Sequence, residues 1–352
     1  MIWIIRQKIE YQQIIIVVRT EIWYNKKCQN ITKNGELQMS KRIRGNIMLL
    51  IATLLWGTTF VAQSEGMRYV EPFTYNAVRT LIGGIVLIPV IAAFNVFSRK
   101  TNPPESKTSK KATIIGGMAC GVVLFAASSL QQCGMTMTTA GKAGFITALY
   151  IVIVPLIELV IYRRSNVFVW ICVVVASAGF YLLCIKEGFK IGRGDWFVLC
   201  CTVFFALHIM VIDYFNSRNA DGIVLACIQF FTAGTLMAIA MLLFESPKLN
   251  AVLNARYTIL YAGIMSSGIA YTLQILGQRY TAPAAATLIM SLESVFAALS
   301  GWLILHEVLS LKETAGCVLV FIAVILAQLK LPDKSAEKII SGRRRKNEKI
   351  SQ

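Results

Sequence analysis

Long apolar runs alternate with short polar stretches from about residue 46 to residue 329. An apolar run of about 20 residues is long enough for a helix to cross the roughly 30 Å of hydrocarbon in a bilayer. Because that hydrocarbon holds no water for unpaired backbone groups, we expect each run to be helical. The ten runs lie at about 46–64, 73–97, 112–133, 140–161 and 167–184, and at about 194–214, 222–244, 257–278, 284–305 and 311–329.

One stretch of the chain returns in altered form: residues 130–156 match residues 273–299 at a constant offset of 143 positions. Apolar helices often match by chance, but a glutamine and a glycine repeated at the same spacing are harder to obtain in that way. We therefore interpret the chain as a duplication. The matched pairs are Leu130/Leu273, Gln131/Gln274, Gly134/Gly277, Thr138/Thr281, Ala143/Ala286, Ile146/Ile289, Leu149/Leu292, Val152/Val295 and Leu156/Leu299.

Each repeat holds five helices, so the second repeat crosses the membrane in the opposite sense. The predicted fold class is an all-α polytopic membrane protein, with ten transmembrane helices as two inverted five-helix repeats at 46–184 and 194–329. Secondary transporters often use this plan and bind their substrate near the midplane, where the halves meet. The pattern therefore favours transport.

Composition agrees with a hydrocarbon environment. The chain is 56% hydrophobic and 15% charged, with a mean hydropathy of +0.62, whereas soluble proteins carry roughly 25% charged residues. The nine cysteines form no CxxC pair and no histidine cluster accompanies them, so neither a zinc site nor a disulfide framework is indicated. We expect no metal and no cofactor.

Catalytic motifs are absent from the sequence. There is no GxxxxGK[ST] phosphate loop and no GxSxG elbow, and HEVLS at 306–310 lacks the second histidine of a zinc protease. We expect a protein that is not an enzyme. Two rivals stay open: an intramembrane enzyme acting on lipid-linked substrates, which would need clustered carboxylates, histidines or a metal, and a non-transporting membrane scaffold, which would not need polar residues at matched depths.

Lysine and arginine gather in alternate loops, and cytoplasmic loops carry such an excess. This predicts a multi-pass protein of the cell membrane with both termini cytoplasmic, and it accounts for much of the +17 net charge without nucleic acid. The cytoplasmic cations would be Lys41, Arg42, Arg44, Arg99, Lys100, Lys107, Lys110, Lys111, Arg163 and Arg164, followed by a basic tail at 330–352.

Residues 1–45 form an N-terminal extension whose apolar runs are too short to span a bilayer. One interpretation is an amphipathic helix at the membrane surface. We favour the other, in which Met39 is the natural start and residues 1–38 are dispensable.

Four segments carry a family resemblance: LLWGTTF (54–60), NAVRTLIGG (76–84), AGKAGFITALYIVIVPL (140–156) and SLESVFAALSGWLILHE (291–307). Over about 46–330 the chain resembles a ten-helix, EamA-type member of the drug/metabolite transporter superfamily. That family often has a glutamate at the exit of the fourth helix, as Glu307 stands at the ninth, whereas this chain has Arg163 and Arg164. The resemblance implies efflux of small metabolites, amino acids or drugs by alternating access. Its expected partners are a small-molecule substrate and the lipid bilayer. A coupling proton and a homodimer are further hypotheses.

Polar and aromatic side chains inside the apolar runs are the candidate substrate-binding residues. Charged groups there cost about 2.5–3.5 kcal/mol on insertion scales and usually face protein or water. Glu293 matches Tyr150 across the repeat, so both could face a central cavity; alternatively, Glu293 is a structural partner of Arg79. Arg79 itself could instead bind an anionic substrate. The full set is Trp56, Arg79, Gln131, Tyr150, His208, Tyr271, Gln274 and Glu293.

The other candidates also allow two interpretations. His208 could titrate near neutral pH and couple transport to protons, or could be hydrogen-bonded to a neighbour. Gln131 and Gln274 could bind a ligand or join helices. Trp56 and Tyr271, like Tyr150, could stack on an apolar substrate or simply pack.

The distribution of lysine and arginine generates a topology prediction. Reporter fusions placed after Gln352 and within 98–111 should both report the cytoplasm, because both positions lie in or beside basic segments. A signal from the opposite side at either position would contradict the inverted-repeat orientation.

Overall fold

The computed structural model describes residues 40–101, 108–138, 140–162, 167–184, 192–304 and 310–330. The chain divides into two compact units, Met1–Arg44 and Gly45–Gln352, and the arrangement below is that of the second unit. The predicted extension at 1–38, the loop residues Arg163 and Arg164, Glu307 and the basic tail beyond residue 330 lie outside the described residues.

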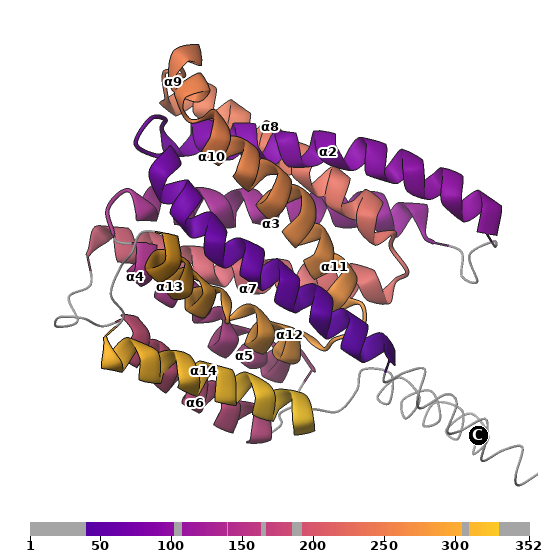
Figure 1. The fold of residues 1–352 in the computed structure, drawn as a ribbon. Helices are drawn as coiled ribbons and strands as arrows, with labels where there is room; N and C mark the ends of the chain where they lie inside the picture. Colours follow the sequence, from indigo (N-terminus) through magenta and orange to yellow (C-terminus); the bar gives the residue numbers. More distant parts are fainter. Residues whose placement is uncertain are drawn as a thin grey trace, which may run out of the picture. The chain divides into compact units, whose positions relative to one another are not determined.

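The described residues form helices and no strand (Figure 1). A first helix, Ser40–Gly66, is followed by α2 (Pro72–Thr101), α3 (Lys110–Met135), α4 (Ala140–Ala148), α5 (Tyr150–Tyr162) and α6 (Val167–Cys184). The second half contains α7 (Arg193–Ser217), α8 (Gly222–Phe244), α9 (Leu249–Asn254), α10 (Arg256–Tyr261), the π-helix η1 (Ala262–Tyr271), α11 (Thr272–Gln278), α12 (Pro283–Met290), α13 (Glu293–Ile304) and α14 (Leu311–Lys330).

All ten predicted runs fall on these helices, which confirms the all-helical membrane fold. Among the described residues, seven helices are long and apolar enough to cross a membrane, and shorter apolar helices occupy Ile146–Ile161, Val167–Gly179 and Thr314–Leu326. The expectation of ten full-length spans is therefore met only in part.

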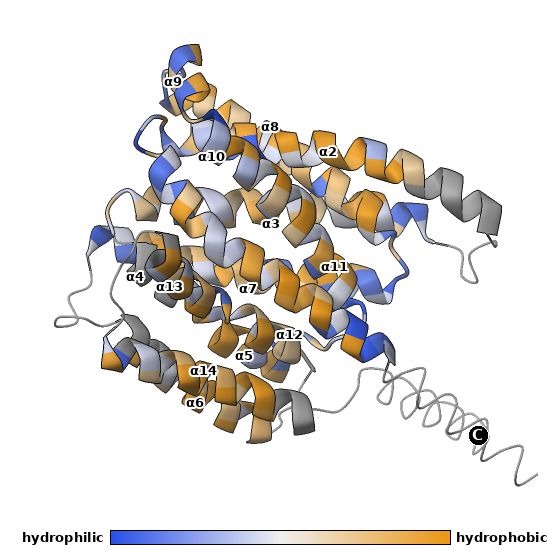
Figure 2. Cartoon of the chain, in the orientation of Figure 1, coloured by the Kyte–Doolittle hydropathy of each residue, from blue (hydrophilic) through white to orange (hydrophobic). Residues whose placement is uncertain are grey.

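The helices consist largely of hydrophobic residues, as the orange colour in Figure 2 shows. Large apolar side chains stand exposed, among them Val160 at 77%, Leu242 at 70% and Phe244 at 76%. Many polar side chains are buried instead, including Asn76 and Gln229. Exposed apolar patches of this extent are rare on proteins surrounded by water. This distribution suits a protein whose outer solvent is hydrocarbon.

Equivalent helices of the two repeats pack against each other: α2 against α8, and α6 against α14. In the α2–α8 pair, Thr74 at the start of α2 contacts Glu245, which lies just after the end of α8. Thr80, further along α2, contacts Met237, which lies earlier in α8. The two helices are thus antiparallel. The crossed pairs α4–α13 and α5–α12 also contact each other, as expected for repeats related by an inverting two-fold axis.

Glycines allow the close approach of helices at several of these contacts. A Cβ added at Gly121 of α3 would come within 2.5 Å of the Cβ of Thr232 on α8, and one at Gly117 within 2.6 Å of the Cβ of Ile228. A real Cβ does not come so close, so the GxxxG step in α3 is a packing surface.

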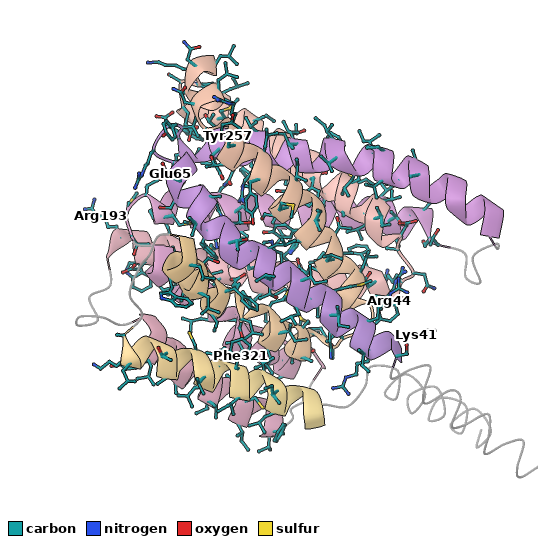
Figure 3. The ribbon with its side chains drawn as sticks, viewed as in Figure 1. Lys41, Arg44, Glu65, Arg193, Tyr257 and Phe321 are labelled. Atoms are coloured by element: carbon teal, nitrogen blue, oxygen red, sulfur yellow. The ribbon has the colours of Figure 1, made fainter. Side chains whose placement is uncertain are left out.

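The first turn of α2 is capped by a side chain from another helix. The carboxylate of Glu245 accepts hydrogen bonds of 2.7 Å from the backbone N–H groups of Phe73 and Thr74, and another of 2.7 Å from the Thr74 hydroxyl. An anion at this position satisfies free N–H groups and complements the positive end of the helix dipole. Glu245 therefore joins the two repeats at one end of their bundle. Figure 3 shows Glu65 and Tyr257 at that same end.

Removing the Glu245 carboxylate should destabilise the protein. For Glu245→Ala we expect a loss of about 0.5–2 kcal/mol, the range for helix caps, seen as a lower Tm in detergent. Glu65→Ala is the matched control, because among the described residues Glu65 forms an ion pair with Arg68 on the surface and such pairs contribute about 0–1 kcal/mol. Equal Tm values for Glu245→Ala and the parent protein would contradict the cap.

Candidate functional site

The fourth and ninth apolar runs are each divided into two helices by a short turn. α4 ends at Ala148 and α5 begins at Tyr150, while α12 ends at Met290 and α13 begins at Glu293. In the first break the Leu149 N–H donates to the carbonyl of Ile146, three residues back, at 3.1 Å. In the second, the Leu292 N–H donates to the carbonyl of Ile289, also at 3.1 Å.

These two breaks are equivalent under the repeat. Leu149 and Leu292, like Ile146 and Ile289, are matched pairs at the offset of 143 residues. The same tightened turn therefore occurs at the same place in both halves. The duplication inferred from sequence has a detailed structural counterpart here, although the apolar pattern had suggested one uninterrupted run in each place.

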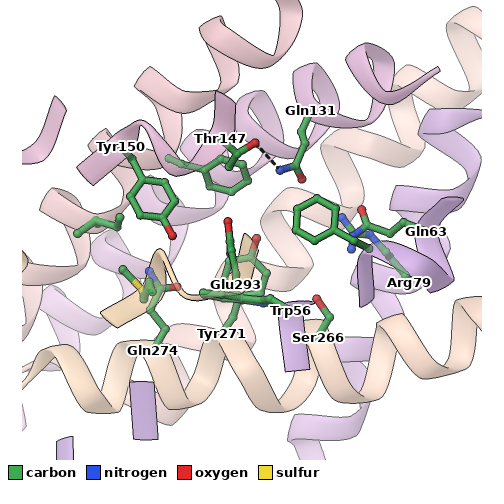
Figure 4. Close-up of a pocket in the computed structure, with 14 residues that line it drawn as sticks. Trp56, Gln63, Arg79, Gln131, Thr147, Tyr150, Ser266, Tyr271, Gln274 and Glu293 are labelled. Carbon is green, nitrogen blue, oxygen red and sulfur yellow. Dashed lines mark hydrogen bonds between the residues drawn. The ribbon is translucent and has the colours of Figure 1, made fainter. Parts of the chain in front are cut away.

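Each break places a polar side chain at the start of the following helix. Tyr150 is the first residue of α5 and Glu293 the first of α13. Both side chains line one cavity, and Figure 4 shows them converging on it. The positive ends of the α5 and α13 dipoles lie beside this cavity, and broken helices of transporters commonly aim such ends at their substrates.

The cavity lies between the two repeats, and the space not filled by atoms amounts to about 510 Å³ when the open solvent at its mouth is included. The first repeat contributes residues from the first helix and from α2 to α5, and the second contributes residues from α7 and from η1 to α13. The lining residues are Trp56, Phe60, Gln63, Arg79, Gln131, Thr147, Tyr150, Phe205, Ile209, Ser266, Tyr271, Gln274, Met290 and Glu293.

Most of the candidates named from sequence are brought together here. Trp56, Arg79, Gln131, Tyr150, Tyr271, Gln274 and Glu293 all line the cavity. Whether they bind a substrate stays a prediction. Gln131 also donates from Nε2 to the Thr147 hydroxyl at 3.1 Å, so it connects α3 to α4 as well.

His208 is the candidate that does not line the cavity. It is fully buried in α7, and its Nε2 lies 2.8 Å from Oε1 of Gln229 on α8. The cavity-lining residues of α7 are Phe205 and Ile209. One helical residue turns the side chain by about 100°, so His208 is directed toward α8 instead. Its position agrees with the interpretation that His208 is hydrogen-bonded to a neighbouring residue.

The remaining lining residues were missed by the sequence analysis. Gln63 and Thr147 are polar residues inside apolar runs, which was a usable signal. Ser266 lies in η1, whose wider turn brings residues five apart, here Ser266 and Tyr271, to similar faces. The apolar lining residues Phe60, Phe205, Ile209 and Met290 give no signal that separates them from ordinary packing residues.

One wall of the cavity is aromatic. The rings of Trp56 and Tyr271 lie 4.8 Å apart at 63°, and Tyr271 is supported by edge contacts of 6.0 Å to the rings of Phe230 and His208. Edge-to-face pairs of this kind are favourable beyond the area that they bury. The wall is therefore well packed and suits an apolar or aromatic part of a ligand.

Several buried polar atoms around the cavity have no hydrogen-bond partner among the described residues: Nε1 of Trp56, Oε1 of Gln63, the hydroxyl of Tyr150 and Oε1 of Gln274. Leaving such an atom unpaired costs about 1–3 kcal/mol. Water or a ligand inside the cavity can supply the missing bonds.

Two charged side chains also line the cavity. Arg79 is 4% exposed and Glu293 6% exposed, and in the described part of the chain no ion pair joins them or pairs either with another residue. The structure thus contains no direct ion pair between Glu293 and Arg79, and the alternative that Glu293 is a structural partner of Arg79 stays untested. The Nε of Arg79 instead donates to Oδ1 of Asn76 at 2.8 Å.

Comparison with known proteins gives the family. The model of the EamA-like transporter family matches residues 43–185 and again residues 192–329. The chain belongs to this family. The two matches cover the two repeats, and this EamA-like protein is accordingly a multi-pass membrane transporter.

Individual relatives agree with that assignment. An Archaeoglobus fulgidus protein named as an uncharacterized transporter is 29% identical over 309 residues, covering 87% of this chain and 92% of the relative. The Bacillus subtilis uncharacterized transporter YoaV is 21% identical over 277 residues, covering 77% and 92%. A solved crystal structure aligns with a TM-score of 0.66 at 19% identity, over 81% of this chain and 96% of that one, and supports the fold alone.

Proposed function

We propose that this EamA-like transporter exports small metabolites, amino acids or drugs by alternating access, and that its substrate binds in the cavity between the repeats. The observation that carries the proposal is the convergence of Arg79, Glu293 and several unpartnered polar atoms on one cavity built by both repeats. Buried ionisable groups that form no ion pair among the described residues are a standing cost that a scaffold would not require.

The broken helices supply a means of opening the cavity toward either side. α4 contacts α13 and α5 contacts α12, and the hydroxyl of Ser294 donates to the carbonyl of Gly144 at 3.1 Å across the first of these contacts. The two-fold axis between the inverted repeats relates the α4–α13 contact to the α5–α12 contact. A movement that separates α4 from α13 therefore has an equivalent movement that separates α5 from α12. Two such states are what alternating access requires.

In this proposal both termini are cytoplasmic, the protein resides in the cell membrane, and Glu293 carries the coupling proton. A carboxyl group that faces a cavity can exchange a proton with water inside that cavity. Glu293 is the acidic residue among those that line this cavity. We therefore assign to Glu293 the proton-coupling role that the sequence had suggested for His208. The homodimer stays a prediction.

Exchange of the Glu293 carboxyl for an amide tests the proposal. Glu293→Gln keeps the shape of the side chain, so the Tm should stay close to that of the parent protein. Loss of a hydrogen bond to a charged group, about 1.5–3 kcal/mol, should reduce transport about tenfold or more. The measurement is counterflow of a metabolite and drug panel in proteoliposomes, with and without a pH gradient.

Glu65→Gln is the matched control, because Glu65 is an exposed partner of Arg68, and it should transport normally. Unchanged transport and unchanged response to the pH gradient in a stable Glu293→Gln protein would refute the proposed site. Loss of transport in both variants would show that the effect is not specific to the cavity.

A further inference from the structure

The guanidinium of Arg79 is held in place by a short chain of hydrogen bonds. Its Nε donates to Oδ1 of Asn76 at 2.8 Å, and Nδ2 of Asn76 donates to the backbone carbonyl of Ser128 at 3.0 Å. Asn76 is completely buried. Since Asn76 lies one turn before Arg79 on α2 and Ser128 lies on α3, the head group is fixed to two helices.

This chain of bonds uses only one of the nitrogens of the guanidinium. Among the described residues, the two terminal nitrogens of Arg79 have no hydrogen-bond partner, and neither belongs to the fully enclosed unpartnered atoms of the cavity wall. They therefore border the open space that Arg79 lines. A planar pair of donors that is held from behind has the geometry that binds a carboxylate or a phosphate in a two-pronged manner.

No described carboxylate neutralises Arg79. Its charge meets the ring of Tyr75, whose centroid lies 5.7 Å from the guanidinium carbon, and a cation–π contact offsets only part of the cost of burying a charge. An uncompensated buried charge costs several kcal/mol. A ligand that brings the opposite charge would remove this cost when it binds.

We propose that Arg79 binds an oxyanion of the substrate, a carboxylate or a phosphate, and that Asn76 is a positioning residue that aims its guanidinium. The inference deepens the proposed function and rests on it, since it assigns a substrate class to the same cavity. Figure 4 shows Arg79 beside Gln63 at one side of the cavity, with Glu293 and Tyr271 nearer its middle. The oxyanion would therefore bind at the Arg79 side, and the aromatic wall of Trp56 and Tyr271 would contact the apolar remainder.

The test is counterflow in proteoliposomes with pairs of compounds that differ only in the oxyanion. Apolar and aromatic carboxylates are compared with their primary amides, and phosphate monoesters with the parent alcohols. The wild-type protein should exchange the charged member of a pair at least tenfold faster than its neutral match. The two arms separate a carboxylate substrate from a phosphate substrate, and activity in either arm supports the inference.

Variants of Arg79 test whether this residue causes the preference for the charged compound. Arg79→Gln should abolish the preference for the charged member, and Arg79→Lys, which keeps the charge and loses the planar pair of donors, should weaken it with a normal Tm. Arg68→Gln is the matched control, because Arg68 is an exposed arginine paired with Glu65, and it should behave as wild type. An unchanged preference in a folded Arg79→Lys or Arg79→Gln protein would overturn the assignment.

Asn76 needs a measurement that a merely structural role would not affect. Asn76→Ala should raise the half-saturation concentration for the oxyanion substrate about tenfold while the maximal rate changes little. A fall in Tm with an unchanged half-saturation concentration would refute the positioning role. Exchange of only neutral or cationic compounds by the wild-type protein would overturn the inference and leave the proposed function standing, whereas exchange of no compound at all would count against both.

Discussion

Hydrocarbon forms no hydrogen bonds, and most features of this transporter follow from that constraint. Backbone groups within the bilayer must bond inside their own helix, and irregular backbone is tolerated only where it is covered by protein or lines a wet cavity. The breaks after Ala148 and Met290 obey this rule, because the residues that follow them, Tyr150 and Glu293, line the central cavity. The exposed residues described on α5 and α13 are apolar.

The same constraint explains where the charges are found. Arg79 and Glu293 are almost fully buried, yet each faces the cavity rather than lipid. The two form no ion pair with each other, so the cavity retains two separate polar sites beside its aromatic wall. A site of this kind can hold a ligand by charge at one position and by apolar contact at another, which is how most small-molecule sites combine specificity with affinity.

The helical fold and the duplication could be predicted because periodic apolar runs and matched residues are properties of the sequence alone. Seven candidate site residues also proved to share one cavity, since polar residues inside apolar runs are conspicuous. The breaks at Leu149 and Leu292 could not be predicted, because neither contains a proline or glycine, and the polar residues Ser291, Glu293 and Ser294 at the second break also fit an unbroken helix that faces a cavity. The Glu245 cap and the Asn76–Ser128 bond depend on contacts between distant segments, and the direction of His208 depends on how α7 packs against α8.

The central claim is that both repeats enclose one cavity that opens to each side of the membrane in turn. The most direct test introduces Ser266→Cys, a small change at a buried lining residue, into a background without the nine native cysteines. A membrane-impermeant thiol reagent is then applied from one side of the membrane at a time, with Lys248→Cys in an exposed turn as the one-sided control. The account predicts that Ser266→Cys reacts from either side while Lys248→Cys reacts from one. Reaction of Ser266→Cys from a single side only, or from neither, would contradict alternating access through this cavity.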